Sequence, residues 1–482
     1  MGAIEPLWDS EEAASACAGR GTGRWQAEDV SIDSRSITRD ALFVAIRGVS
    51  GDGHAYVADA LKNGAAAAMV DHLPEGVARD APILMVRDTQ AGLEALAAAA
   101  RARSAARIVA VTGSAGKTGS KEMLRAAFAR QGMTHASQAS YNNLWGVPLS
   151  LARMPRKTEF GVFEIGMNHA GEISPLTKIV RPHAAIVTTI APAHIGNFES
   201  LTAIAEAKAE IFSGLSPGGV AVINQDSPFF ELLARRAREA GAAKVIGFGA
   251  SPEAEARLVK AVHHAECSCI LADICGQPLT CKIGLSGNHW AMNALAVLAV
   301  VQALGGDIAL AALALAELMP LAGRGRRHRL RIADGVFTLI DESYNANPAS
   351  MLAALQTLSG HMTEGRGRRI AVLGDMGELG EESEKYHREL AGVVADSRVQ
   401  LTFTAGKKMQ LLHDSLPRAL RGAHAGDAAA LITPLCEALR PGDVVMVKGS
   451  HSSNMGNVVK GLLAFGEADL KGARFETGIN MG

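Results

Sequence analysis

The sequence predicts an α/β protein of three domains whose sheets are mostly parallel. The chain has 482 residues, which corresponds to about three domains of ordinary size. Its high content of alanine and glycine indicates α/β layering. From residue 105 to residue 322, apolar runs of strand length alternate with helical segments, as in a parallel sheet covered by helices on both faces.

The first predicted domain is a small α/β unit over residues 1–104. A loop rich in turn-forming residues, Gly48–His54, lies between its first strand and its first helix. Upstream, Asp33, Ser34 and Arg35 lie in a polar loop, where they suit either an ordinary turn or a polar ligand. The local sequence alone favours the turn. The expected strands are 42–46, 65–70 and 83–87, and the expected helices are 56–63 and 90–103.

The second predicted domain, residues 105–322, contains the segment around which the chain is organised. The apolar run Ile108–Thr112 ends in a glycine-rich turn, Gly113–Gly116, and helix-forming residues begin at Lys117. Glycines let backbone N–H groups converge on an anion, and the start of a helix adds its positive dipole end. This order of strand, loop and helix predicts a phosphate-binding loop for ATP. The other expected strands are 161–165, 184–190, 220–223 and 244–248.

The predicted loop departs from the standard phosphate-binding motif in its spacing. In the motif, a lysine such as Lys117 contacts the terminal phosphates and a hydroxyl such as that of Thr118 binds Mg²⁺. The standard motif has four residues between its glycines, whereas only Ser114 and Ala115 lie between these two. The competing interpretation is an ordinary helix N-terminus with a lysine there by chance.

Two polar side chains follow strands of the predicted central sheet. Glu164 lies in the strand 161–165, and His194 follows the strand that ends near Ile190. Ligands gather at the carboxyl ends of parallel strands in open α/β sheets. Glu164 and His194 are therefore candidate Mg²⁺ ligands beside Thr118.

The helix that follows residue 200 carries a lysine on its apolar face. Lys208 shares this face with Leu201 and Ile204, and alanines lie beside it. A bare ammonium on a core-facing surface is costly, so a snorkelling side chain or a salt bridge to a glutamate is the ordinary explanation. The alternative is that CO₂ carbamylates Lys208, which would give it a carboxylate-like end near a metal ion.

The third predicted domain covers residues 323–482. The break Pro320–Gly323 precedes it, and a basic run over 324–329 follows, which is expected to be a solvated linker. Arg324 is also a candidate phosphate ligand from this run. Gly374–Gly380 resembles a dinucleotide-binding motif but has different glycine spacing, so we interpret it as a loop and not as an NAD site. The expected strands are 337–341, 369–374, 401–404 and 443–448.

Composition and charge argue against several classes of function. The net charge of -1 disfavours binding to nucleic acid or to a membrane surface through general electrostatics. No apolar stretch is long enough to span a bilayer and the N-terminus lacks an export signal, so we expect a cytoplasmic protein without membrane insertion. Four cysteines cluster between Cys267 and Cys281, but their spacing favours reduced thiols packed in a sheet over a zinc site.

A series of short segments in a fixed order gives the chain a specific resemblance. The most distinctive are the loop 112–118, the stretch Asp341–Pro348 and the stretch Leu373–Gly380. Together the segments resemble those of the ATP-dependent Mur ligases, a family that builds the peptide stem of bacterial peptidoglycan. Trp290 and His451 depart from the family pattern, which often has Asn and Arg there. The remaining segments are 33–35, 43–45, 52–54, 141–143, 146–148, 164–166, 194, 207–208, 293–296, 323–325 and 448–450.

The resemblance implies an N-terminal UDP-binding domain, a central ATPase domain with a P-loop-type sheet, and a C-terminal Rossmann-like domain that brings the amino substrate. It implies Lys117, Glu164, His194 and a carbamylated Lys208 as catalytic groups, with Mg²⁺ on Thr118, Glu164 and His194. The implied ATP contacts are Gly113, Ser114, Ala115, Gly116, Lys117, Thr118, His289, Asn293, Arg324 and Asp341. The implied substrate contacts are Asp33, Ser34 and Arg35 for UDP, Asn142 and Asn143 for the muramoyl peptide, and Tyr344, Asn345 and Asn347 for a dipeptide.

Within the family, Tyr344–Pro348 and Gly374–Gly380 favour the branch that joins D-alanyl-D-alanine to UDP-N-acetylmuramoyl-tripeptide. The chain also lacks the Asp-Asn-Pro-Arg stretch with which a sister branch recognises a diamino acid. The implied reaction phosphorylates a carboxylate with ATP, and an amine then attacks the acyl phosphate. We expect a monomer.

Two rival functions remain at this point. A folylpolyglutamate synthase would share the ATP loop and metal ligands, but it would leave the block from Asp33 to His54 without a purpose. A nucleotide-binding switch or scaffold would bind ATP without ligase activity.

Overall fold

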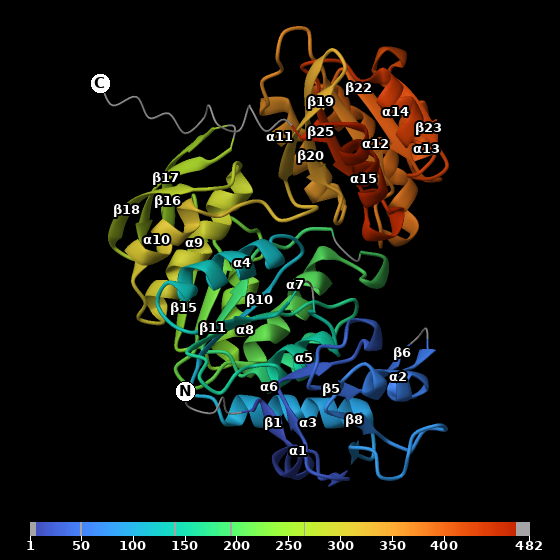
Figure 1. The fold of residues 1–482 in the computed structure, drawn as a ribbon. Helices are drawn as coiled ribbons and strands as arrows, with labels where there is room; N and C mark the ends of the chain where they lie inside the picture. The colour runs from blue at the N-terminus through green and yellow to red at the C-terminus, as the bar shows by residue number, and fades with distance from the viewer. Residues whose placement is uncertain (1–5, 49–50, 139–140, 193–194, 265, 469–482) are drawn as a thin grey trace, which may run out of the picture.

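The computed structural model describes residues 6–48, 51–138, 141–192, 195–264 and 266–468. Three large sheets of five, nine and seven strands follow one another along the chain. Figure 1 shows the first sheet in blue at the bottom, the second in green and yellow in the middle, and the third in orange and red at the top. This α/β architecture confirms the predicted fold class. Within the described ranges, no helix is long and apolar enough to cross a membrane.

The N-terminal sheet has the strand order β2-β9-β8-β5-β4. Neighbours from β4 to β9 pair in parallel, and β2 is antiparallel at the edge. The helix α3 (Thr89–Ala102) begins where the side chain of Asp88 accepts a hydrogen bond from the amide of Ala91. The strands are β2 (Arg20–Gly21), β4 (Asp29–Ser31), β5 (Ala41–Val44), β8 (Ala67–Val70) and β9 (Ile83–Met85), with α1 (Ser10–Ala16) and α2 (Val57–Lys62) beside them.

Buried polar contacts fix this N-terminal unit to the central one. The indole Nε1 of Trp8 donates to the carbonyl of Ala152 at 2.8 Å, and the guanidinium of Arg103 lies 3.9 Å from the centre of the same ring system. Arg101, which is nearly buried, donates to the carbonyls of Val180 and Arg181. These contacts join the two units through buried side chains.

The central sheet has the order β11-β12-β10-β13-β14-β15-β16-β17-β18. It is parallel from β11 to β16, and β17 and β18 extend it as an antiparallel hairpin. The strands are β10 (Arg107–Thr112), β11 (Thr134–Ala136), β12 (Phe160–Glu164), β13 (Ala184–Val187), β14 (Val220–Asn224), β15 (Lys244–Gly249), β16 (Ala256–His263), β17 (Ser268–Ile274) and β18 (Gln277–Ile283). The helices are α4 (Lys117–Ala129), α5 (Gly146–Ala152), α6 (Ile173–Val180), α7 (Leu201–Ala209), α8 (Phe230–Glu239), α9 (Asn288–Ala303) and α10 (Ile308–Ala316).

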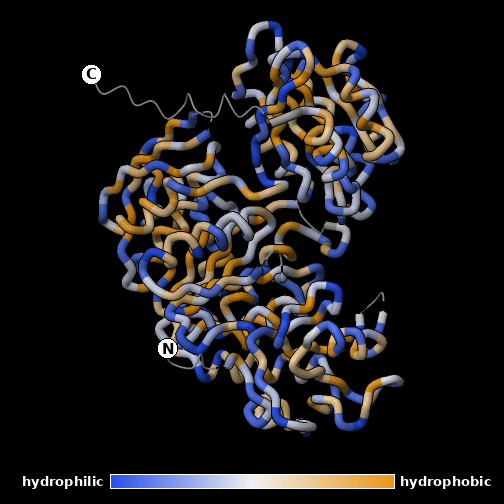
Figure 2. The backbone as a smooth tube through the Cα atoms, viewed as in Figure 1, coloured by the Kyte–Doolittle hydropathy of each residue, from blue (hydrophilic) through white to orange (hydrophobic). Residues whose placement is uncertain are grey.

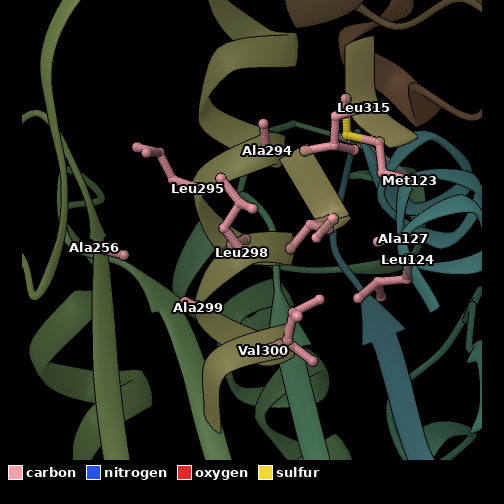
Figure 3. Packing of buried hydrophobic residues seen from close by; sticks show 14 of the residues in the cluster. Met123, Leu124, Ala127, Ala256, Ala294, Leu295, Leu298, Ala299, Val300 and Leu315 are labelled. Atoms are coloured by element: carbon pink, nitrogen blue, oxygen red, sulfur yellow. The ribbon is translucent and has the colours of Figure 1, made fainter. Parts of the chain in front are cut away.

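The core of the central unit joins the helix after the glycine loop to the sheet. Figure 3 shows Leu124 and Ala127 of α4 facing Leu298 and Val300 of α9, and it shows Leu315 of α10 close to Met123 of α4. These side chains are fully or almost fully buried. Packing of these side chains fixes α4 against α9 and α10. Because the glycine loop leads directly into α4, its position is fixed as well.

The C-terminal sheet has the order β23-β22-β21-β24-β20-β19-β25, with two separate hydrophobic clusters packed against it. In Figure 2 the backbone of this upper unit has hydrophobic segments in orange and hydrophilic segments in blue. Its strands are β19 (Arg326–Ile332), β20 (Gly335–Glu342), β21 (Arg369–Gly374), β22 (Leu401–Ala405), β23 (Arg421–Ala425), β24 (Val444–Lys448) and β25 (Glu467–Ala468). Its helices are α11 (Pro348–Gly360), α12 (Ser383–Asp396), α13 (Met409–Ser415), α14 (Ile432–Ala438) and α15 (Gly456–Phe465).

One segment differs from its prediction, and another agrees with it. The basic run is not a linker, because residues from Arg326 onward form β19, which pairs with β20 over its whole length. Pairing with β20 orders the run, and Leu330 is buried. The clustered cysteines are free thiols; Cys269 on β17 and Cys281 on the adjacent β18 lie in the sheet as expected, whereas Cys267 precedes β17 and Cys275 lies in the turn between the two strands.

Candidate active site

The turn after β10 has a shape that only glycine permits at two positions. Gly113 and Gly116 have φ angles of 150° and 84°. A Cβ atom on Gly113 would lie 1.9 Å from Oγ1 of Thr188, and one on Gly116 would lie 3.0 Å from Oδ1 of Asn293. The loop backbone therefore lies directly against β13 and α9, and it opens toward the N-terminus of α4.

Side chains and carbonyls of the next strand brace this loop. The amide of Ser114 donates to the carbonyl of Thr189 at 2.8 Å, and its hydroxyl exchanges hydrogen bonds with the backbone of Ala191. The hydroxyl of Thr188 donates to the carbonyl of Ala115 at 2.5 Å. These contacts brace the loop against the residues that follow β13.

Lys117 is the first residue of α4 and lies over the loop. Its Nζ donates to the carbonyl of Gly113 at 2.7 Å. Desolvation lowers the pKa of Lys117, while the nearby carboxylate of Glu164 acts in the opposite direction. An anion in the loop would restore the charged form of this side chain, because it would place negative charge beside a desolvated ammonium.

Glu164 lies at the end of β12, the strand that pairs with β10. Its carboxylate lies beside the hydroxyl of Thr118, which follows the glycine loop after β10. The hydroxyl of Thr118 donates to Oε2 of Glu164 at 2.8 Å, and Nδ2 of Asn142 donates to Oε1 at 2.7 Å. Glu164 is only 1% exposed. A buried carboxylate beside a hydroxyl is the oxygen-rich ligand set that Mg²⁺ prefers.

Arg324 reaches this centre from the segment that leads into the C-terminal unit. Its Nη2 donates to the hydroxyl of Thr118 at 3.1 Å, and its guanidinium lies 4.1 Å from the centre of the Tyr344 ring. Asp341 fixes the turn that carries it, because its carboxylate accepts hydrogen bonds from the amide of Gly323 and from the hydroxyl of Ser343. The C-terminal unit thus contributes a cation to the glycine loop.

Lys208 on α7 is 1% exposed, and in the described part of the chain it has no hydrogen bond or ion pair. The salt bridge to a glutamate that the sequence left open is therefore not found among these residues. Desolvation, with the charge of Lys117 added to it, lowers the pKa of Lys208 well below its usual value. Both effects favour the neutral, nucleophilic form of the amine over the ammonium.

The remaining residues predicted to bind the nucleotide lie around the same loop. His194, the other predicted Mg²⁺ ligand, lies outside the described residues. Asn293 contacts Gly116, and Trp290 of the same helix lies against Gly119 of α4. Desolvation lowers the pKa of His289, and the charge of Glu342 from the C-terminal unit opposes this effect. The start of α9 therefore lies between the glycine loop and the C-terminal unit.

The predicted substrate residues are divided between three places. Asn142 joins the centre through Glu164, whereas Oδ1 of Asn143 accepts the amide of Gly146 at the start of α5. Asp33 pairs with Arg35 in an exposed turn of the N-terminal unit that also contains Ser34.

On the C-terminal side, Asn347 caps α11 through a reciprocal bond pair with Ser350. Tyr344 lies under Arg324, and the carbonyl of Asn345 accepts from Nζ of Lys448.

Lys448 at the end of β24 is a residue to which the sequence assigned no role. It is 3% exposed, and its Nζ lies 3.4 Å from Oε2 of Glu342. Desolvation lowers its pKa, which Glu342 opposes. The sequence could have indicated a role for Lys448, because the residue belongs to the family-like segment 448–450 and follows a predicted strand. Ligands in parallel sheets bind at the carboxyl ends of the strands.

The family-like segment 52–54 of the N-terminal unit forms a closed polar network. Nδ1 of His54 lies 2.6 Å from Oδ1 of Asp52, and Asp71 accepts from Nη2 of Arg47 at 2.9 Å and contacts Nδ1 of His72 at 2.6 Å. Arg47 supplies the positive charge that balances these carboxylates. The network fixes the loops at one edge of the N-terminal sheet.

Gly113→Ala is expected to distort the loop, because the methyl group has no space beside Thr188. The variant should lose nucleotide affinity by at least about tenfold and should lose about 1–3 kcal/mol of unfolding free energy. Isothermal calorimetry with ADP and chemical denaturation measure both effects. Gly171→Ala is the control, because that glycine also has a positive φ but has open space around its Cβ position; equal losses in both variants would contradict this explanation.

Comparisons with known proteins agree with this geometry. Family models match residues 27–101 (Mur ligase family, catalytic domain), 111–301 (Mur ligase middle domain) and 325–451 (Mur ligase, glutamate ligase domain). The UDP-N-acetylmuramoyl-tripeptide--D-alanyl-D-alanine ligase of Escherichia coli is 35% identical, over 91% of this chain and 96% of that protein. The ligase of the same name from Rickettsia prowazekii is 30% identical, over 94% and 99%.

Solved structures extend the comparison. The crystal structure of MurF from Acinetobacter baumannii has a TM-score of 0.82 and 27% identity, and it covers 95% of this chain and 99% of that one. The folylpolyglutamate synthase of Mycobacterium tuberculosis, at 18% identity, a TM-score of 0.60 and coverage of 76% and 95%, shares the fold alone. From the three family matches and these near-full-length relatives, we conclude that the chain belongs to the Mur ligase family.

Proposed function

We propose that this chain is an ATP-dependent ligase that joins D-alanyl-D-alanine to UDP-N-acetylmuramoyl-tripeptide and releases ADP and phosphate. The observation that carries the proposal is the continuous set of contacts from Arg324 through Thr118 and Glu164 to Asn142. It joins groups suited to a phosphate, a metal ion and a peptide substrate at one point. The names of the Escherichia coli and Rickettsia prowazekii relatives supply the substrates.

In this reaction the protein would act mainly by positioning the substrates and by neutralising the charge of the phosphates. A carboxylate is a poor acyl donor, so the γ-phosphoryl group of ATP is transferred to it and gives an acyl phosphate. Lys117 and the loop amides would bind the phosphates, and Arg324 would add a second cation. Thr118 and Glu164, with His194, would hold Mg²⁺, which neutralises phosphate charge when bound. The amine of the dipeptide then attacks the acyl carbon and expels phosphate.

We also propose that Lys208 is carbamylated. The neutral form of an amine is the one that reacts with CO₂, and the lowered pKa of Lys208 favours that form. The carbamate would carry a negative charge, which the positive charge of the nearby Lys117 would stabilise. A carbamate would therefore replace a desolvated amine with an anion that can pair with Lys117. This agrees with the burial of Lys208 in a helix whose neighbouring side chains are alanines.

The proposed assignment of the units follows the sheets. Residues 1–104 would bind the UDP end, with Asp33, Ser34 and Arg35 among the contacts, residues 105–322 would bind ATP, and residues 323–482 would bring the dipeptide. Asn143 and Asn347 would contribute mainly by holding α5 and α11, since Asn143 accepts the amide of Gly146 at the start of α5 and Asn347 caps α11. Tyr344 and Asn345 would lie nearer the dipeptide. His289 and Asn293 would contact the adenine, and Asp341 would hold Arg324 in place.

We place the reaction in the cytoplasm and expect a monomer. The six free cysteines suit a reducing compartment, and ATP is the phosphoryl donor there. Gel filtration of the purified protein at two concentrations tests the oligomeric state.

The assay that tests the proposed function is phosphate release with each substrate omitted in turn. We expect release to require ATP, UDP-N-acetylmuramoyl-tripeptide and D-alanyl-D-alanine together. Basal hydrolysis that is indifferent to both other substrates would favour the switch or scaffold. Mass spectrometry of the product with a diaminopimelate-containing and a lysine-containing tripeptide identifies the accepted stem.

A further inference from the structure

Three side chains able to bind a metal ion meet at the carboxyl ends of two parallel strands in the N-terminal unit. β5 and β8 pair in parallel, and Asp71 and His72 follow directly after β8. His54 lies in a short 3₁₀ helix, Gly53–Tyr56, whose first amide donates to the carbonyl of Ile46 just beyond β5. Ligands of open α/β sheets gather at this edge. The fold therefore brings the three side chains together where sheets of this kind bind ligands.

The atoms of His54, Asp71 and His72 have the spacing of a metal site. One potential ligand atom of each side chain lies within 4.8 Å of the other two. Oδ1 of Asp71 is 3.2 Å from Nε2 of His54 and 2.6 Å from Nδ1 of His72. In a tetrahedral zinc site, ligand atoms are about 3.3 Å apart. The first pair has this separation, and the second reaches it by a small outward movement of His72, whose side chain is 54% exposed.

Asp52 holds the ring of His54 in the tautomer that binds a metal ion. Nδ1 of His54 lies 2.6 Å from Oδ1 of Asp52, and Nε2 accepts the amide of Asp71 at 3.2 Å. The proton is therefore on Nδ1 and the lone pair on Nε2, as in the carboxylate–histidine pairs that support metal ligands. That lone pair also faces Oδ1 of Asp71. Two acceptors at this distance repel each other unless a cation lies between them.

Arg47 is a cation that a bound metal ion would have to displace. Its Nη2 lies 2.9 Å from Oδ1 of Asp71, and its Nε lies 3.3 Å from Oδ2 of Asp52. The side chain of Arg47 is 57% exposed, so it can move into solvent without leaving a buried cavity. A divalent ion on Asp71 would take over the charge balance and would be repelled by the guanidinium in its present position. Binding of an ion and the pairing of Arg47 with Asp71 therefore compete.

We propose that His54, Asp71 and His72 bind a divalent cation of the zinc class through Nε2, a carboxylate oxygen and Nδ1. Two imidazoles and a carboxylate suit Zn²⁺, whereas Mg²⁺ prefers oxygen ligands throughout. His72 would then carry its ring proton on Nε2, and a water molecule would fill the fourth position on the solvent side. The ion would link the helix that follows β5 to the end of β8. This site lies in a different unit from the ATP loop and does not rest on the proposed function.

The test titrates the whole chain, free of any affinity tag and stripped of metal with a chelator, with Co²⁺ and with Zn²⁺ in the absence of ATP. Co²⁺ absorption separates a nitrogen–oxygen site from binding to the free cysteines, because thiolate ligands add intense charge-transfer bands. We expect His72→Ala to weaken binding at the nitrogen–oxygen site by at least about tenfold. His169→Ala is the control and should match wild type, since it removes an exposed imidazole that lies 3.1 Å from a single carboxylate, that of Glu172. A large excess of Mg²⁺ should leave the titration unchanged.

A second variant tests the competition with Arg47. Arg47→Gln removes the cation beside Asp71, so the affinity for Zn²⁺ should rise by about fivefold. Thermal unfolding checks the fold of each variant, and added Zn²⁺ should raise the midpoint of wild type more than that of His72→Ala. Equal binding of Co²⁺ by wild type and His72→Ala, or weaker binding of Zn²⁺ by Arg47→Gln, would overturn the inference. Because these measurements use neither ATP nor the peptide substrates, their outcome is independent of the proposed ligase reaction.

Discussion

Lys208→Ala is expected to abolish ligation, by at least about a thousandfold in kcat, and a small carboxylic acid such as formate is expected to restore part of it. The wild-type amine is buried and has no hydrogen bond or ion pair among the described residues, and its lowered pKa favours the neutral form that reacts with CO₂. Removing the side chain leaves space into which a free carboxylate can enter as a substitute. Phosphate release at increasing formate concentration measures the recovery. An active variant that needs no added acid would show the carbamate proposal to be wrong.

The same substitution site allows a separation of activity from stability. Lys208→Met keeps the volume of the side chain and removes the desolvated amine, so the unfolding free energy should rise by about 1–3 kcal/mol while ligation is lost. Chemical denaturation with CO₂-free buffer measures the change. A fall in stability would mean that the amine has a favourable partner in the folded protein.

The pH dependence of this difference has a defined sign. In the folded protein the pKa of Lys208 is well below 10.5, so at this amine the unfolded chain binds more protons than the native state. The stability of wild type relative to Lys208→Met should therefore increase as the pH rises from the folded pKa toward the unfolded one. Denaturation midpoints of both proteins at pH 7 and pH 9 test this slope. If wild type were more stable relative to Lys208→Met at pH 7 than at pH 9, the result would contradict the prediction.

Lys117→Met is expected to lower kcat/KM by about 10²- to 10³-fold. The ammonium of Lys117 lies over the loop and would contact the phosphoryl group as charge develops on it. Its Nζ also donates to the carbonyl of Gly113, so the variant loses a contact that closes the loop. Phosphate release and calorimetry with ATP separate the loss of catalysis from the loss of binding.

The control for this variant is Arg125→Gln, which changes a half-exposed cation on the same helix that pairs with Glu122. Arg125 lies two turns beyond the loop, so its removal should alter kcat/KM by less than about twofold. If both substitutions reduced activity equally, the effect of Lys117 would belong to the general charge of α4 and not to contact with the phosphate.

The parts of the fold that follow from local sequence were predictable. Apolar runs gave the parallel strands, because a strand buried on both faces needs a continuous hydrophobic segment. The same reasoning placed Thr118 and Glu164 at the ends of neighbouring units, and the structure brings them to 2.8 Å. The glycine spacing of the loop likewise indicated where the backbone would have to approach its neighbours.

The features that depend on contacts between distant segments were not predictable. Residues 326–329 look like a linker because their side chains are charged, yet pairing with β20 makes them a strand. The contact of Gly196 with Gly380 joins segments far apart in the chain, and neither glycine is part of a pattern that predicts the other. Likewise, the bond from Arg324 to Thr118 depends on how the C-terminal unit is placed.

The packing of Trp290 gives the protein a natural optical probe. A Cβ atom on Gly119 would lie 2.5 Å from the indole, so the ring rests on the first turn of α4, directly beneath the phosphate loop. Of the four tryptophans, Trp8 and Trp25 belong to the N-terminal core and Trp145 precedes α5. Nucleotide arrival should therefore be visible as a change in intrinsic fluorescence that Trp290→Phe removes, and titrations can follow occupancy of the loop without a label.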